Sequence, residues 1–158
     1  MSLLDRSAIA ARVPHAGPMC LLDSVLSWDE QGIECAAAVR AVSAHPLACD
    51  GRVPATAVIE YAAQAMALHG RLVQEQAGAA AAPRRGFLAA LRFVRLHCRW
   101  VDVATTSLTV RASRFAGDEV QVLYDFEVEA AGPIAAGRAV VVLDASARDP
   151  APAGAARP

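Results

Sequence analysis

The sequence predicts an α+β domain in which one long apolar helix packs against an antiparallel sheet. Residues 54–76 form a single long helix-like segment, and strand-like segments bounded by turn residues precede and follow it. The chain has 158 residues, 55% of them hydrophobic and 20% charged, which suffices for the core of one domain. A lone apolar helix among antiparallel strands buries its faces only if the sheet wraps around it, so we expect that arrangement.

The segment before the helix is predicted to begin with a short helix near residues 4–11 and to continue as a β-hairpin. The stretches "MCLLDSVLSW" (19–28) and "GIECAAAVRAV" (32–42) are rich in apolar and β-branched residues. Turn-forming residues at 29–32 separate them. The two stretches therefore predict paired strands.

The long helix is predicted to begin at Pro54 and to end near Gln76. A loop at residues 43–53 precedes it. Proline is well tolerated at the first helical position, because the N–H it lacks would be unpaired there. The small residues at 78–82 and the proline after them terminate the helix.

The second half of the chain is predicted to consist of strands. The segments are 86–98, 107–115, 119–130 and 134–143, with turns at 116–118 and 131–133. We therefore expect one folded domain at residues 1–145. Residues 146–158 are rich in Ala and Pro without periodicity and predict a disordered tail.

Charge, hydropathy and cysteine content narrow the class of partner and the location. The formal net charge of −1 gives no overall attraction to nucleic acid or an anionic membrane, so we expect neither as a partner. No uninterrupted apolar run has the length of a membrane span, and the start lacks the order of a secretory signal, so we expect a cytoplasmic protein. Four scattered cysteines without a CxxC pair are predicted to be buried free thiols rather than metal ligands.

A narrow polar stripe interrupts the long helix. Thr56, Glu60 and Gln64 are spaced by four residues and share one ridge, whereas Leu68 and Leu72 continue it. The stripe is either the solvent edge of an amphipathic helix or the lining of a pocket. In a pocket, desolvation would disfavour the charged form of Glu60 and suit it to proton transfer near neutral pH.

All fifteen basic residues of the chain are arginines, and five of them cluster. There is no acidic residue between Glu75 and Asp102, a stretch that contains Arg84, Arg85, Arg92, Arg95 and Arg99. Such a patch could bind a phosphate group and the acidic surface of a partner protein. The alternative interpretation is a solvated sheet edge.

Two motifs resemble a known enzyme family. "VPHAGPMCLLDSV" (13–25) and "HPLACDGRVPATAVIEYAAQAM" (45–66) are similar to the signature regions of the β-hydroxyacyl-acyl carrier protein dehydratases. The similarity is closer to the dehydratase-like branch associated with aryl polyene pigment biosynthesis. The resemblance implies a hot-dog fold, two subunits side by side, and a 3-hydroxyacyl thioester carried on the phosphopantetheine arm of acyl carrier protein. The arginine-rich stretch could then bind the phosphate of that arm and the acidic surface of the carrier protein. It implies no metal and no redox cofactor.

The resemblance also implies catalytic residues. In that family a histidine before the helix and an acid on the helix, from different subunits, eliminate water, and Glu60 matches the acid. The matching histidine is His45, in Ala-His-Pro-Leu where the family has Gly-His-Phe-Pro, and one residue farther from the glutamate. Either the longer loop still delivers His45 to the site, or Asp50 and the backbone occupy its place.

The elimination requires three groups. A neutral histidine takes the α-proton, the glutamic acid protonates the leaving hydroxyl, and N–H groups at the helix start hold the enolate oxygen. By the resemblance, we expect Arg52, Ala55 and Gln64 to contact the substrate.

The other three histidines are given structural interpretations. We interpret His15 as a loop residue of the opening motif, His69 as a solvent-facing residue near the helix end, and His97 as a strand residue beside Cys98.

Three hypotheses for function follow. The first is a dehydratase of 3-hydroxyacyl thioesters, and the second is a thioesterase of the same fold that uses Glu60 to activate water. The third is a non-catalytic dehydratase-like subunit that pairs with an active paralogue. The first and third imply a homodimer or a heterodimer.

Overall fold

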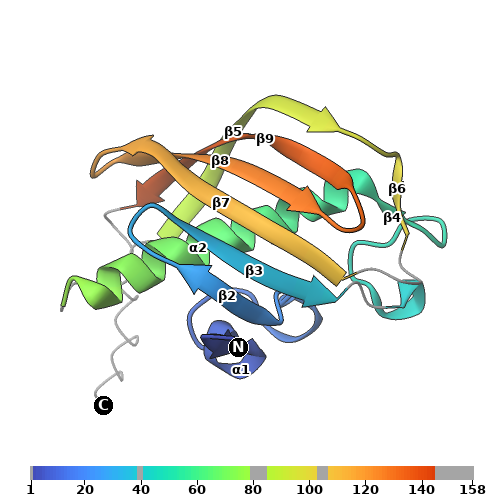
Figure 1. Ribbon diagram of the computed structural model, residues 1–158, viewed down its shortest axis with the longest axis horizontal. Coiled ribbons are helices and arrows are strands. Elements are labelled where there is room, and N and C mark those ends of the chain that lie inside the picture. The colour runs from blue at the N-terminus through green and yellow to red at the C-terminus, as the bar shows by residue number, and fades with distance from the viewer. Residues whose placement is uncertain (1, 39–40, 79–84, 103–106, 145–158) are drawn as a thin grey trace, which may run out of the picture.

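A seven-stranded antiparallel sheet wraps around one long helix (Figure 1). The computed structural model describes residues 2–38, 41–78, 85–102 and 107–144. In spatial order the strands are β1 (Leu4–Asp5), β2 (Ser24–Trp28), β3 (Gly32–Ala38), β7 (Ser107–Gly117), β8 (Gln121–Glu129), β9 (Pro133–Asp144) and β5 (Arg85–Leu96). The α+β architecture predicted from the sequence is confirmed.

Helices and a small second sheet connect these strands. The helical elements are α1 (Arg6–Ala10), η1 (Gly17–Met19), η2 (Val42–Ala44), η3 (Ala55–Ala57) and α2 (Val58–Gln76). The second sheet pairs β4 (Val53–Pro54) with β6 (Trp100–Val101) just before the long helix. In the described residues, no helix is long and apolar enough to cross a membrane.

Alternation along the strands places the core between α2 and the sheet. On β8 the side chains of Val122, Tyr124, Phe126 and Val128 are buried and their neighbours are more exposed. The helix packs chiefly against β3, β7 and β8. The fully buried residues of α2 include Ala62, Ala65 and Leu68, whose small or flexible side chains allow close approach to the sheet.

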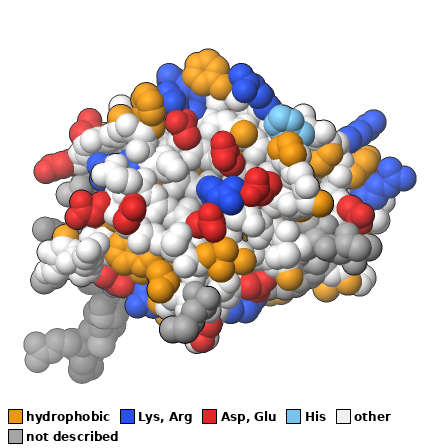
Figure 2. All heavy atoms as spheres, viewed as in Figure 1, with side chains coloured by type: hydrophobic (Ala, Val, Ile, Leu, Met, Phe, Trp, Pro, Cys, Tyr) orange, Lys and Arg blue, Asp and Glu red, His pale blue; other side chains and the backbone are white. Residues whose placement is uncertain are grey.

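The outer face of the sheet carries several ion pairs. The Arg111 guanidinium binds Glu34 Oε2 and Glu129 Oε1, each at 2.6 Å. Figure 2 shows acidic and basic side chains next to one another in the middle of this face. The Arg138 guanidinium pairs with Asp125 across β8 and β9. The same guanidinium lies 3.5 Å from the centre of the exposed Phe115 ring, so this face combines ion pairs with some apolar surface.

The start of α2 differs from the prediction. Pro54 lies in β4, with φ −67° and ψ 147°, and pairs with Trp100 instead of opening the helix. The Ala55 N–H donates to the Arg99 carbonyl at 3.0 Å, which holds the chain in the small sheet for one more residue. The first turn is therefore the 3₁₀ segment η3, and the α-helix begins at Val58.

Other elements are shorter than, or shifted from, those predicted. The first predicted strand begins only at Ser24, because the preceding residues form a loop bound to α2. The second hairpin turn lies after Gly117, where the Asp118 carboxylate accepts from the N–H groups of Val120 and Gln121. The predicted tail at 146–158 lies outside the described residues.

The cysteine prediction is right for two residues and wrong for two. Cys20 and Cys35 are buried free thiols, and burial raises the pKa of Cys35 to about 12. Cys49 is exposed and Cys98 is half-buried. Both of these lie near the small β4–β6 sheet: Cys49 pairs with Arg52 just before β4, and Cys98 precedes β6.

The interpretation of His69 as a solvent-facing residue is wrong. Its ring is buried, with 1% of the residue exposed. Nε2 lies 2.8 Å from the Asp29 carbonyl oxygen and therefore donates to it, and Nδ1 accepts from the Tyr124 hydroxyl at 2.8 Å. This description applies to the neutral imidazole, which burial favours by lowering the pKa of His69 below the ordinary 6.5. The helix continues past His69 under the β2–β3 hairpin, which covers the ring.

We predict that the free energy of unfolding falls as the pH drops below about 6.5. The unfolded chain then binds a proton at His69 that the folded chain excludes, so stability is present above pH 6.5 and is lost below it. Each such histidine can contribute up to about 1.4 kcal/mol per pH unit. Urea unfolding of the wild type and His69→Gln between pH 5 and 8 measures this. An equal slope in both proteins would contradict the assignment.

Candidate functional site

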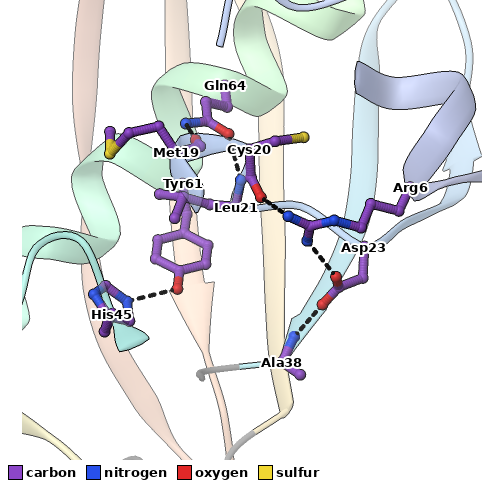
Figure 3. A network of polar contacts seen from close by, with 9 residues as sticks. All are labelled: Arg6, Met19, Cys20, Leu21, Asp23, Ala38, His45, Tyr61 and Gln64. Atoms are coloured by element: carbon purple, nitrogen blue, oxygen red, sulfur yellow. Dashed lines mark hydrogen bonds and ion pairs between the residues drawn. The ribbon is translucent and has the colours of Figure 1, made fainter. Parts of the chain in front are cut away.

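The Gln64 side chain fastens the N-terminal loop to the long helix. It is fully buried on α2. Its Oε1 accepts from the Leu21 N–H at 2.9 Å, and its Nε2 donates to the Met19 carbonyl at 2.7 Å (Figure 3). Because the side chain has no exposed surface in this chain, the contact of Gln64 with substrate stays a prediction.

A second set of contacts fixes the far side of the same loop. Arg6 on α1 binds Asp23 at 2.9 Å and donates to the Cys20 carbonyl at 2.6 Å. The other Asp23 oxygen accepts from the Ala38 N–H at 2.7 Å (Figure 3). The loop is therefore held to the helix at one end and to α1 and β3 at the other.

Glu60 lies one turn before Gln64 on α2 and is half-buried, with 31% of its side chain exposed. Its Oε1 atom is 3.0 Å from His15 Nε2 and accepts a hydrogen bond from Gln64 Nε2 at 3.1 Å. In the described residues its Oε2 atom makes no hydrogen bond or ion pair. One oxygen is thus anchored and the other is available.

His15 contacts Glu60, a contact that the sequence analysis missed. Nε2 donates toward the carboxylate, whereas Nδ1 is buried and has no partner in the described residues. The polar stripe contains Glu60 and the opening motif contains His15, so each pattern indicated one of the two residues. Their contact depends on how the loop closes over 45 residues of sequence, which neither motif encodes alone.

His45 is buried and contacts Tyr61 rather than Glu60. Only 6% of the residue is exposed. Nδ1 accepts from the Leu47 N–H at 3.1 Å, so in the neutral ring Nε2 carries the proton and donates to the Tyr61 hydroxyl at 2.9 Å (Figure 3). Burial lowers the pKa of His45, and the pKa of Tyr61 rises to about 12, mainly through burial.

The two predicted catalytic residues therefore have separate partners within one chain. Glu60 and Tyr61 are consecutive on α2 and point about 100° apart around its axis. His45 contacts the Tyr61 side chain, and His15 contacts the Glu60 side chain. Among the described residues, no group of three potential ligands could hold a metal ion.

The other two predicted substrate contacts lie at the start of the helix. Arg52 is exposed, and its guanidinium lies 5.3 Å from the centre of the Trp100 ring. Arg99 is 5.6 Å from the same ring. Ala55 is buried and its N–H is taken by the Arg99 carbonyl, so this amide is not free to bind an enolate oxygen.

Two shallow hollows lie elsewhere. One of about 310 Å³ lies beside Trp100 and Ile134, and another of about 380 Å³ lies beside Trp28 and Arg114. Neither is lined by Glu60 or His45.

Comparison with known proteins identifies the family. The model of the ApeP-like family, described as ApeP dehydratase, matches residues 7–151. The chain belongs to the ApeP-like dehydratase family. This confirms the resemblance to the dehydratase-like branch. No curated protein sequence gives a significant match.

Solved structures confirm the fold of this family member. The dehydratase heterocomplex ApeI:P from Xenorhabdus doucetiae matches with a TM-score of 0.75 and 21% identity, covering 90% of this chain and 93% of that chain. The Escherichia coli PaaI protein of the phenylacetic acid degradation operon matches with a TM-score of 0.56 and 17% identity, covering 87% and 88%. A hypothetical thioesterase with coenzyme A from Streptococcus pneumoniae matches with a TM-score of 0.57 and 9% identity, covering 76% and 84%. The hot-dog fold is therefore shared with both kinds of protein.

We predict that Gln64→Leu destabilises the fold. The substitution leaves the buried Leu21 N–H without an acceptor, which costs about 1–3 kcal/mol. Urea unfolding measures the change, and Thr56→Val on the exposed part of the same stripe is the control. A Gln64→Leu protein as stable as the control would show that the loop does not depend on this amide.

Proposed function

We propose that this chain is a subunit of a dehydratase that removes water from 3-hydroxyacyl thioesters on acyl carrier protein, in aryl polyene biosynthesis. Family membership supports the reaction class. The observation that carries the proposal is the arrangement of Glu60, whose side chain is partly exposed. Its Oε1 is anchored by two donors, whereas its Oε2 has no partner among the residues that the structure describes. Acyl carrier protein as partner and the cytoplasm as location are parts of this proposal.

In the proposed reaction Glu60 acts as the acid. A base removes the proton on the α-carbon, the electron pair forms the carbon–carbon double bond, and the C3–oxygen bond breaks. Protonated Glu60 delivers its proton from Oε2 to the departing hydroxyl, which leaves as water. His15 and Gln64 are positioning residues, because both act on Oε1 and leave Oε2 directed to the substrate.

We propose that the base comes from a second, dehydratase-like chain. Both nitrogens of His45 are engaged within this chain, so His45 could act only after leaving Tyr61 or Leu47. Neither hollow on this chain contains Glu60, which fits a site completed by another subunit. The related solved structure from Xenorhabdus doucetiae is titled a dehydratase heterocomplex. The catalytic role predicted for His45 stays a prediction.

The proposal predicts unequal effects of two substitutions. In the complex with its paralogue, Glu60→Gln should lower the dehydration rate by about 10²–10⁴-fold, because a positioned proton donor is lost. His45→Ala should retain far more activity, although it lowers stability. Mass analysis of 3-hydroxyacyl carrier protein for loss of water measures both, and Glu30→Gln in the exposed turn is the control. Full activity in Glu60→Gln would overturn the proposal. Equal losses of activity in the two variants would show that His45 takes part in the reaction.

His15 is tested separately. His15→Leu should lower turnover by about 10- to 100-fold, the value of a hydrogen bond to a charged group. His15→Gln retains an N–H donor and should restore part of this loss. If His15 had only a structural role, the two variants would have equal activity at equal stability. Their pH–rate profiles would also match that of the wild type.

Thioester hydrolysis is the second candidate. The free Oε2 of Glu60 could also activate water, and solved structures with this fold include proteins titled thioesterases. The same mass analysis separates the two reactions, because hydrolysis gives free acid whereas dehydration leaves the acyl group on the carrier.

A further inference from the structure

Strand β5 is an edge strand of the sheet, and many of its exposed side chains are apolar. It pairs with β9 on one side and ends the strand order of the sheet. Six of its large apolar side chains are exposed: Phe87, Leu88, Leu91, Phe93, Val94 and Leu96. Leu91 and Leu96 lie opposite the buried residues Ala139 and Ala135 of β9, so both point to the helix side of the sheet. The apolar inner face therefore continues past the part of the sheet that α2 covers.

A strained residue marks the middle of this edge. The pairing of β5 with β9 is interrupted between Arg92 and Arg95. Within this bulge Phe93 has φ 55° and is 78% exposed. A bulky side chain is disfavoured in this backbone region, and glycine would fit there without strain. The chain thus holds an aromatic side chain in solvent at an energetic cost.

The charges on the edge have one sign. Arg92 and Arg95 are exposed and make no ion pair with any described residue. Arg92 lies opposite Arg138, whose charge is already paired with Asp125. There is no acidic residue between Glu75 and Asp102, so the strand supplies no carboxylate to another strand. Figure 2 shows apolar and basic side chains together along the edge where Figure 1 places β5.

We infer that β5 pairs with an acidic edge strand of a non-identical chain and that its arginines disfavour pairing between two copies of this chain. If two copies of β5 paired in antiparallel fashion, no register would place an arginine opposite an acidic residue, because β5 contains none. Registers that place arginines opposite each other would be destabilised by repulsion between like charges. An acidic partner strand would pair these charges and cover the same apolar surface. This inference rests on the proposed two-chain function and identifies the surface that selects the partner.

Charge reversal tests the inference without the natural partner. Arg85→Glu/Arg92→Glu/Arg95→Glu converts the edge into an acidic strand, whereas Arg114→Glu changes a charge on β7 as a control. Wild type and the triple variant should each associate weakly alone and should form a mixed dimer when combined, with a dissociation constant about tenfold or more below that of either alone. Added salt should weaken the mixed dimer and strengthen wild-type self-association.

Light scattering and native mass spectrometry report these species, and circular dichroism checks that each variant is folded. A tight wild-type homodimer at low salt, or a mixture no tighter than its components, would overturn the inference. Equal mixed association with Arg114→Glu would also overturn it. These measurements need no substrate, so their failure would leave the dehydration test of the proposed function standing.

Phe93→Gly separates the apolar contact from the charge effect. It should leave the monomer as stable as the wild type or more stable, because the backbone strain is relieved, while weakening the mixed dimer. An unchanged mixed dimer with Phe93→Gly would show that Phe93 is not part of the pairing surface.

Discussion

The buried side-chain amide of Gln64 is the contact on which the candidate site depends. The loop before β2 has little regular structure, and its buried backbone groups need partners from elsewhere in the chain. Gln64 supplies one acceptor and one donor to that loop and also donates to Glu60. The loop in turn carries His15 to the same oxygen of the Glu60 carboxylate. One amide thus couples loop position to carboxylate position.

Two buried histidine–tyrosine pairs limit which imidazoles near α2 can act as a base. His45 is bonded to Tyr61 and the Leu47 N–H, and His69 to Tyr124 and the Asp29 carbonyl, so each ring contacts protein groups through both nitrogens. Burial lowers the pKa of both imidazoles and so favours their neutral forms. Such satisfied rings give specificity to the core but are poorly available as bases. Glu60 differs, because in the described residues its Oε2 atom has no hydrogen-bond partner and 31% of its side chain is exposed. The neighbouring imidazole, His15, directs Nε2 to the same carboxylate, and its Nδ1 atom is buried. Within the described residues α2 therefore presents an acid without an accessible basic nitrogen beside it, which suits a reaction shared between two subunits.

The sequence predicted the helix and the stripe well because both follow from local periodicity. It could not predict that Thr56 is exposed while Gln64 is buried, since that gradient depends on where the loop crosses the helix. The contact of His15 with Glu60 was missed, and His69 was misjudged, for the same reason. Each lies in a segment whose surroundings come from residues at least 40 positions away. Contacts between distant segments are set by topology rather than by motif.

The arginine-rich stretch shows the same limit and leads to a further step. From the sequence alone, the stretch could be a solvated sheet edge or a binding site for an anionic partner. The local sequence does not determine whether this strand lies at the edge or in the middle of the sheet. Once β5 is an edge, exposed leucines and phenylalanines on it would invite aggregation between copies. Arginine limits that risk, since its charge repels a second copy while its long stem can still pack along apolar surface. The same residues can therefore oppose self-pairing and, with a strand that supplies carboxylates, stabilise the intended pair.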